Sequence, residues 1–164
     1  MTSAHYSIGT ALPALLCAAA ILAAAATAAP ASERRGAATN PTYQTECAAC
    51  HIAYPPQLLP ASSWKRMMDG LDRHFGTDAS LAAAAAGEIG SFLQANAAQG
   101  KRAAGGESTL RITETGWFKR KHDEVPARTW RQSEIRSPAN CSACHKQAEQ
   151  GDFSERNVRI PKPL

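Results

Sequence analysis

The chain has few of the long apolar side chains from which a protein core is normally built. Leu, Ile, Val and Phe together account for 18 of the 136 residues from 29 to 164, or about 13%. A chain below about 20% in these residues has difficulty burying enough apolar surface to fold. The formal net charge of the 164 residues is nevertheless only +4. The composition therefore predicts that something other than side chains supplies part of the apolar interior.

Charged side chains are absent from the first 32 residues, which contain no Lys, Arg, Asp or Glu. Within them, a run of Ala, Leu and Ile extends from Ala11 to Ala29 and includes Ala26-Thr27-Ala28. An apolar run with a small-residue cleavage site is typical of a secretory signal peptide. We therefore expect residues 1–28 to be a signal peptide, with a soluble mature chain exported to the periplasm. The run is nearly long enough to span a bilayer, so an uncleaved anchor is the alternative.

Cysteine occurs at only five positions, and Cys17 lies in the expected signal peptide. The other four form two pairs of identical spacing, each followed directly by a histidine: Cys47-Ala48-Ala49-Cys50-His51 and Cys141-Ser142-Ala143-Cys144-His145. This pattern is the one that attaches c-type haem. The two thiols add to the two haem vinyl groups, and the histidine that follows reaches the iron. Two covalent haems would also supply the apolar volume that the side chains lack.

Other chemistries of paired cysteines fit the sequence less well. A thioredoxin-like dithiol needs a preceding strand in an α/β fold, and no strand pattern is evident here. A four-cysteine zinc site normally has its two pairs much closer together than Cys47 and Cys141 are. A disulfide within either pair would be strained. None of these alternatives accounts for a histidine directly after both pairs.

Each haem iron needs a second axial ligand, and the chain offers few candidates. Apart from the expected signal peptide, the only other histidines are His74 and His122, and the only methionines are Met67 and Met68. Methionine is the usual rival to histidine as an axial ligand. We expect His74 to serve with His51 and His122 with His145, although a crossed pairing stays open. Two histidines on each iron leave no position for a substrate, which favours electron transfer over catalysis.

The pattern of apolar residues and helix caps predicts a mostly α fold with two small helical subdomains, each built around one covalently attached c-type haem. After a flexible N-terminus over residues 29–39, the expected subdomains are residues 40–98 and 108–164, joined by a Gly-rich linker over 99–107. Expected helices run from Pro41 to Cys47, from Ser62 to Gly76, from Asp78 to about Asn96, and from Ser137 to Gly151. In this scheme His74 lies on the apolar face of the second helix.

Several stretches together resemble the small dihaem cytochromes c of proteobacterial periplasms. They are CAACHIAYPPQLLPASSW, GLDRHFG, WFKRKHDEV and SPANCSACHKQAEQGDFSERNVRIP, and the resemblance runs from about residue 42 to 162, nearly all of the expected mature chain. The resemblance implies a two-part helical protein with one haem in each part and two histidines on each iron. It implies haem attachment at Cys47, Cys50, Cys141 and Cys144, and iron ligation by His51, His74, His122 and His145.

The resemblance also implies partners, which the residues themselves do not identify. Members of this family pass electrons to a small oxygen-binding monohaem cytochrome c, with a membrane b-type cytochrome as the source. We therefore expect an electron carrier rather than an enzyme, and no nucleic-acid partner. The alternative is a haem enzyme or gas-binding cytochrome with one open iron position. A basic cluster, Lys119-Arg120-Lys121, is either a docking patch, a propionate anchor or an ordinary solvated face.

Overall fold

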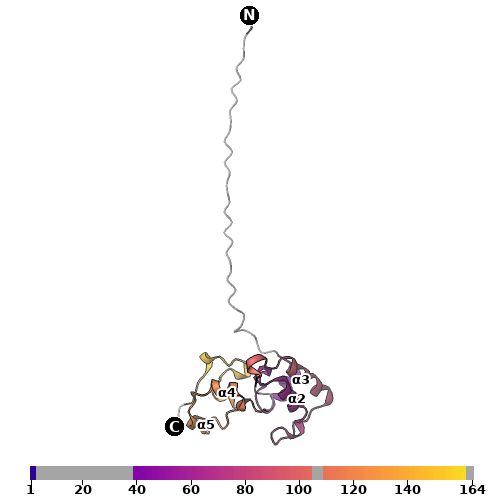
Figure 1. Cartoon of the computed structure of the whole chain (residues 1–164), viewed down its shortest axis with the longest axis vertical. Coiled ribbons are helices and arrows are strands. Elements are labelled where there is room, and N and C mark those ends of the chain that lie inside the picture. Colours follow the sequence, from indigo (N-terminus) through magenta and orange to yellow (C-terminus); the bar gives the residue numbers. More distant parts are fainter. Residues whose placement is uncertain (3–38, 105–108, 162–164) are drawn as a thin grey trace. The chain divides into compact units, whose positions relative to one another are not determined.

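The computed structural model describes residues 1–2, 39–104 and 109–161. Residues Arg34–Leu164 form one compact unit, whose described part contains all the helices labelled in Figure 1. Residues 3–28 of the expected signal peptide and nearly all of the expected flexible N-terminus lie outside the described residues, as do residues 105–107 of the expected linker. The division into two haem subdomains stays a prediction. We refer below to residues 39–104 as the N-terminal segment and to residues 109–161 as the C-terminal segment.

The regular structure of the described residues consists of helices and short 3₁₀ turns, without a named strand. The expected mostly α fold class is therefore confirmed. The α-helices are α1 (Pro41–Cys47), α2 (Ala61–Met68), α3 (Ala83–Ala95), α4 (Gly116–Lys121) and α5 (Ala127–Trp130). The 3₁₀ turns are η1 (Pro56–Leu58), η2 (Leu71–Arg73), η3 (Gly100–Arg102), η4 (Ile112–Glu114), η5 (Cys141–Ala143), η6 (Ala148–Gln150) and η7 (Glu155–Asn157).

Helix α1 begins and ends where the sequence predicts. The side chain of Asn40 accepts a 2.7 Å hydrogen bond from the backbone N–H of Tyr43, and Pro41 occupies the first turn. These are the residue types that favour a helix start. The amide of Asn40 also donates a 2.8 Å hydrogen bond to Glu88 of α3. This bond ties the start of α1 to α3 and so fixes the position of Cys47, the last residue of α1.

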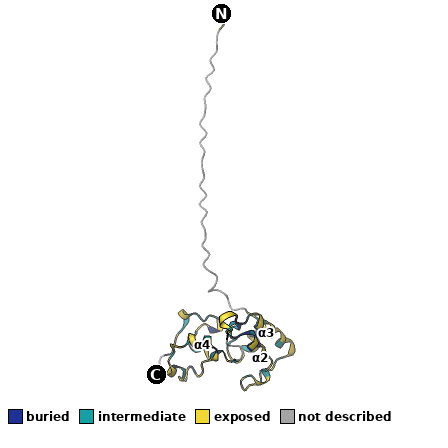
Figure 2. Ribbon diagram, in the orientation of Figure 1, coloured by how far each residue is buried: buried dark blue, intermediate teal, exposed yellow. Residues whose placement is uncertain are grey.

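The buried core of the N-terminal segment lies around α2 and α3, which pack side by side (Figures 1 and 2). Trp64 is 4% exposed and donates a 2.7 Å hydrogen bond from Nε1 to the carbonyl of Pro56. The rings of Tyr43 and Phe92 lie 5.5 Å apart and join α1 to the same core. The core cluster is Tyr43, Leu59, Trp64, Ile89, Leu93 and Ala97.

The C-terminal segment has a smaller set of buried side chains. Phe118 of α4 is 8% exposed and Ile135 is 1% exposed. The hydroxyl of Thr115 accepts a 3.1 Å hydrogen bond from the N–H of Phe118 and caps α4. Because so few side chains are buried here, little of the interior can come from the polypeptide alone.

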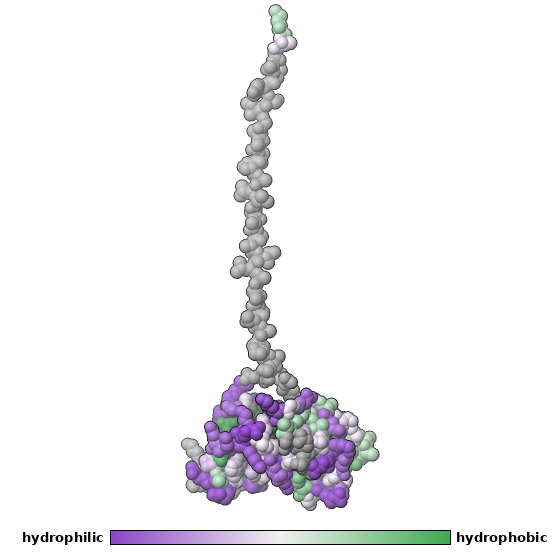
Figure 3. Space-filling model, in the orientation of Figure 1, coloured by the Kyte–Doolittle hydropathy of each residue, from purple (hydrophilic) through white to green (hydrophobic). Residues whose placement is uncertain are grey.

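No helix of the described residues is long and apolar enough to cross a membrane. On the face seen in Figure 3, hydrophilic residues cover much of the described part of the compact unit, with apolar patches between them.

The helix expected from Ser62 to Gly76 is shorter than the sequence predicts. Helix α2 ends at Met68, and Gly70 and the short turn η2 follow. A glycine within a helix costs about 1 kcal/mol relative to alanine, which favours an end at this point. His74 therefore does not lie on the apolar face of a helix, and the loop after η2 positions it instead.

Two other expected helices also differ from the structure. Helix α3 begins at Ala83, because the carboxylate of Asp78 accepts a hydrogen bond from the N–H of Ser80 and forms a local turn rather than a helix cap. The stretch from Ser137 to Gly151 forms the separate 3₁₀ turns η5 and η6 rather than one helix. It lacks the wide apolar face that stabilises a surface helix by packing.

The importance of the small core is testable with one substitution at two sites. Ile89 is 0% exposed and Ile160 is 49% exposed. We expect Ile89→Ala to lower the free energy of unfolding by about 2–5 kcal/mol, through lost burial and the resulting cavity. Ile160→Ala should change it by less than about 0.5 kcal/mol. Denaturant titration of the haem-loaded protein checks both values, and equal losses would contradict the core described here.

Candidate haem-binding site

The first Cys-x-x-Cys-His motif lies at the end of α1. Cys47 is half-buried, whereas Cys50 and His51 are exposed. Nδ1 of His51 lies 2.7 Å from the carbonyl oxygen of Ile52. A hydrogen bond from Nδ1 to a carbonyl fixes the tautomer of the ring and leaves Nε2 free to bind a metal.

His74 faces His51 from the loop that follows η2. The centres of the two rings lie 6.1 Å apart, and the ring planes make an angle of 33°. Phe75 and Gly76 have positive φ angles of 51° and 96°, which turn the chain directly after His74. The N–H of Thr77 donates a 3.0 Å hydrogen bond to the carbonyl of His74 and closes the loop. Glycine adopts the left-handed region without steric cost, and therefore suits this turn.

The second motif occupies η5 and the residues directly after it. The N–H of His145 donates a 2.8 Å hydrogen bond to the carbonyl of Cys141. The N–H of Arg159 donates a 2.8 Å hydrogen bond to the carbonyl of Cys144. His145 and Val158 pair as a single antiparallel β-bridge. The tail of the chain thus positions the motif, in place of the helix that the sequence predicts.

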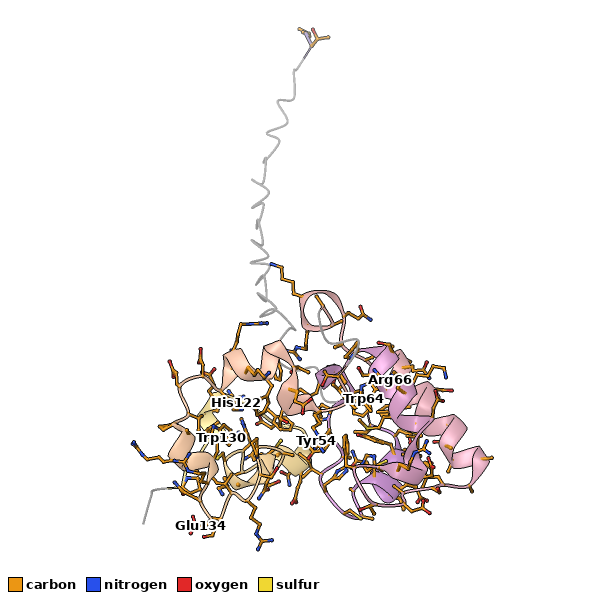
Figure 4. The ribbon with its side chains drawn as sticks, turned by 60° about the horizontal axis from the view of Figure 1, so that its bottom comes forward. Tyr54, Trp64, Arg66, His122, Trp130 and Glu134 are labelled. Carbon is orange, nitrogen blue, oxygen red and sulfur yellow. The ribbon has the colours of Figure 1, made fainter. Side chains whose placement is uncertain are left out.

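His122 directly follows α4 and faces His145, with ring centres 6.1 Å apart and planes at 72°. Its ring stacks on Phe118 at 4.0 Å and lies 5.9 Å from the ring of Trp130 (Figure 4). Nδ1 of His122 lies 2.9 Å from the carbonyl oxygen of Phe118. One histidine of each facing pair is therefore anchored by a carbonyl. In the first pair the anchored histidine is His51, which directly follows its Cys pair. In the second pair it is His122, which is distant in sequence from Cys141 and Cys144.

The spacing of both histidine pairs suits a metal ion between the rings. A bond of about 2.0–2.1 Å from a metal to each nitrogen, with about 1.1 Å from nitrogen to ring centre, gives about 6.2–6.4 Å between centres. The observed value is 6.1 Å in both pairs. The pairing that the structure brings together is the one favoured from the sequence, whereas ligation itself stays a prediction.

A cavity of about 720 Å³ is lined by all four of these histidines. Cys47, Cys50 and Cys141 also line it, so it includes parts of both motifs. Most of its other walls are apolar, as a porphyrin ring requires. Examples are Leu58, Leu71, Leu81, Leu110, Trp117 and Phe153.

Burial keeps two of the four histidines in the form that binds metal. The pKa of His74 lies below its usual value because of burial, and the neighbouring His51 lowers it further. Burial also lowers the pKa of His145, with His122 adding to the effect and Asp152 opposing it. A neutral imidazole has a free lone pair, which a metal ligand needs.

The four cysteines of the two motifs form no disulfide. Burial raises the pKa of Cys47 and that of Cys141 to about 11, and it also raises the pKa of Cys144. The thiolate is the species that attacks disulfides and binds metal ions. Burial of these three sulfur atoms therefore disfavours the thiolate form.

Among the described residues, no group of three or more His, Cys, Asp or Glu side chains converges to hold a metal ion. Haem iron needs only two protein ligands, because the porphyrin supplies the other four. Facing histidine pairs beside Cys-x-x-Cys motifs fit that requirement.

Aromatic residues around the histidines were not among the sequence-predicted site residues. The ring of Tyr54 lies 4.9 Å from that of His51, and the ring of Phe153 lies 5.3 Å from that of His145. Burial raises the pKa of Tyr54 to about 12, and the neighbouring Cys141 adds to the rise. Their closeness in sequence to a candidate ligand could have indicated two of these residues. Tyr54 stands three residues after His51, and Phe118 stands four residues before His122.

The sequence model of the dihaem cytochrome c family matches residues 43–153. The chain belongs to the dihaem cytochrome c family. As a member, it carries two covalently bound haem c groups with their iron, and it is a dihaem c-type cytochrome. The facing histidines, the cysteines that form no disulfide and the apolar cavity described above fit these groups.

Solved structures of dihaem cytochromes c resemble this chain. A dihaem cytochrome c from Rhodobacter sphaeroides is 50% identical to this chain, with a TM-score of 0.63. The match covers 70% of this chain and 97% of the Rhodobacter chain. A crystal structure of DHC purified from the same organism is 52% identical over 71% and 98% of the two chains, with a TM-score of 0.62. A dihaem cytochrome type c from Shewanella baltica is 41% identical over 74% and 93%, with a TM-score of 0.65. No curated protein matches the chain.

Each motif should hold one haem independently of the other. Replacing Cys47 and Cys50 by Ser should leave one covalent haem, and replacing Cys141 and Cys144 by Ser should do the same, because serine cannot form the thioether. Intact mass and the pyridine haemochrome assay count the haems. Cys17→Ser lies outside both motifs and should retain two. Loss of both haems from a folded single-motif variant would contradict independent attachment.

Proposed function

We propose that this dihaem cytochrome c is a periplasmic electron-transfer protein with two histidines on each iron. His51 and His74 serve one haem, and His122 and His145 serve the other. The observation that supports this most is the pair of equal 6.1 Å spacings between facing imidazole rings. The carbonyls of Ile52 and Phe118 would hold His51 and His122 with Nε2 toward the iron.

Two axial histidines leave the iron without an open position for a substrate or gas. The haem groups supply one-electron redox chemistry when bound, and the protein sets their potentials through ligands, hydrogen bonds and burial. Histidine in place of methionine gives a lower potential. The expected activity is therefore electron transfer at low potential rather than catalysis.

The location and the partners in this proposal come from the sequence and from the family. Residues 1–28 would direct export, and the exported chain would then act in the periplasm. A membrane b-type cytochrome would supply electrons, and a small oxygen-binding monohaem cytochrome c would receive them. The basic cluster Lys119-Arg120-Lys121 is exposed at the end of α4, directly before His122. Its charge suits an acidic partner docking near the C-terminal site.

Removing a distal histidine should open one iron to carbon monoxide. His74→Ala should create one binding site for carbon monoxide per chain, and His122→Ala should create one at the other haem, because alanine leaves the axial position empty. The unmodified protein should bind none. Spectra of the reduced protein during a stoichiometric titration with carbon monoxide measure the number of sites.

Methionine variants provide the matched control, because Met67 and Met68 also line the cavity. Met67→Leu and Met68→Leu nearly conserve side-chain volume and remove the rival sulfur ligand. Both should leave the spectra unchanged. Rapid binding of carbon monoxide to one haem of the unmodified protein would contradict the proposal and favour a gas-binding or enzymatic role.

Docking through the basic cluster should make electron transfer to an acidic monohaem cytochrome c depend on salt. The rate should fall as ionic strength rises, because salt screens the attraction between partners. Lys119→Glu should slow transfer at low salt. Arg73→Glu makes the same charge change beside His74 and should have less effect. Stopped-flow kinetics measure the rates, and a rate independent of salt would exclude this docking site.

A further inference from the structure

Tyr54 connects the two sites through its ring and its hydroxyl group. Its ring centre lies 4.9 Å from that of His51, with the planes at 31°. Its hydroxyl donates a 2.7 Å hydrogen bond to the carbonyl oxygen of Ala139 in the C-terminal segment. Figure 4 shows Tyr54 between the ribbons of the two segments. One side chain therefore contacts an iron-facing histidine at one end and the opposite segment at the other.

The acceptor of this hydrogen bond lies beside the second motif. Ala139 stands two residues before Cys141, and the sulfur of Cys141 lies 3.6 Å from the same carbonyl oxygen. The N–H of Ala139 donates a 3.1 Å hydrogen bond to the hydroxyl of Ser137. The amide of Asn140 donates a 3.1 Å bond to the carbonyl of Ile135, a residue only 1% exposed. The acceptor is therefore held in place by its own segment.

Tyr54 is held equally firmly on its own side. Its carbonyl accepts a 2.7 Å hydrogen bond from the hydroxyl of Tyr43, which is 4% exposed in α1. Pro55 and Pro56 follow it and restrict the backbone. The carbonyl of Pro56 accepts the 2.7 Å hydrogen bond from the buried Trp64. The chain at Tyr54 is thus fixed to the core of the N-terminal segment.

We propose that Tyr54 is a positioning residue that fixes the N-terminal haem site relative to the C-terminal one, and thereby sets the rate at which the two exchange an electron. The proposal rests on the electron-transfer function proposed above. In the exchange, one iron is oxidised from ferrous to ferric and the other is reduced from ferric to ferrous, without making or breaking a covalent bond. The hydroxyl is essential, because it is the part of the side chain that bonds to Ala139.

Other contacts between the two segments should preserve the fold when this hydroxyl is removed. The guanidinium of Arg111 lies 4.3 Å from the ring centre of Phe75. Ile112 of η4 packs against the core of the N-terminal segment. Neither contact involves a residue of the second Cys-x-x-Cys-His motif. These two contacts join the segments away from the second motif. Tyr54, in contrast, links His51 at the first site to Ala139 beside the second.

The test is Tyr54→Phe in the haem-loaded protein. Laser-flash reduction by a flavin radical adds one electron per chain, and the absorbance then reports its redistribution between the two haems. We expect this intramolecular phase to become several-fold slower in Tyr54→Phe. Two haems per chain and unchanged low-spin spectra should show that the sites themselves remain intact.

Tyr43→Phe is the matched control, because it also removes a tyrosine hydroxyl that donates a 2.7 Å hydrogen bond to a carbonyl. That bond ends on the backbone carbonyl of Tyr54, where Pro55, Pro56 and the hydrogen bond from Trp64 to Pro56 still restrict the chain, and the contact of the Tyr54 hydroxyl with Ala139 stays intact. The exchange rate should therefore stay close to that of the unmodified protein. A purely structural role for Tyr54 predicts similar losses of unfolding midpoint in both variants and no difference in exchange rate.

The outcomes separate this proposal from the function on which it rests. Slower exchange in Tyr54→Phe alone supports the positioning role. An unchanged rate in Tyr54→Phe, or equal slowing in both variants, overturns it and leaves the electron-transfer function in place. An unmodified protein whose two haems exchange no electron would overturn the proposed function as well.

Discussion

The separation between facing imidazole rings is the constraint on which the rest of this structure depends. Both pairs hold their rings 6.1 Å apart, although their planes differ, at 33° and 72°. Each pair joins a histidine beside a Cys pair to one far away in the sequence. Different local structures produce the same spacing, a left-handed turn after His74 and the end of α4 before His122. The spacing, rather than the secondary structure, is what the two sites share.

The scarcity of apolar side chains and the presence of two haems have one physical explanation. Within residues 39–104 and 109–161, the compact core lies around α2 and α3, and the C-terminal segment buries little beyond Phe118 and Ile135. A cavity of about 720 Å³, lined by the histidines and by apolar residues, occupies the space where more core would be expected. Covalent haem fills such a space with apolar surface, which stabilises the folded chain. The haem groups therefore serve structure as well as chemistry.

The sequence predicted the chemistry of this protein better than its local structure. The Cys-x-x-Cys-His motifs identify haem because their chemistry requires fixed spacing, and the count of remaining histidines suggested the partners of His51 and His145. Helix α1 was predictable from Asn40 and Pro41. The helices expected through His74 and through Cys141 do not form, because Gly70 favours an earlier end of α2 and the stretch around Cys141 lacks a wide apolar face. The hydrogen bond between Tyr54 and Ala139 was not predictable, since nothing in either segment indicates the other.

The electron paramagnetic resonance spectrum of the fully oxidised, haem-loaded protein tests the central claim most directly. Two histidines on each ferric iron predict two low-spin signals of equal intensity. The different angles of 33° and 72° between ring planes predict that the two signals have different g values. A high-spin signal from half of the iron would contradict the account, because it would mean that one haem lacks its second histidine.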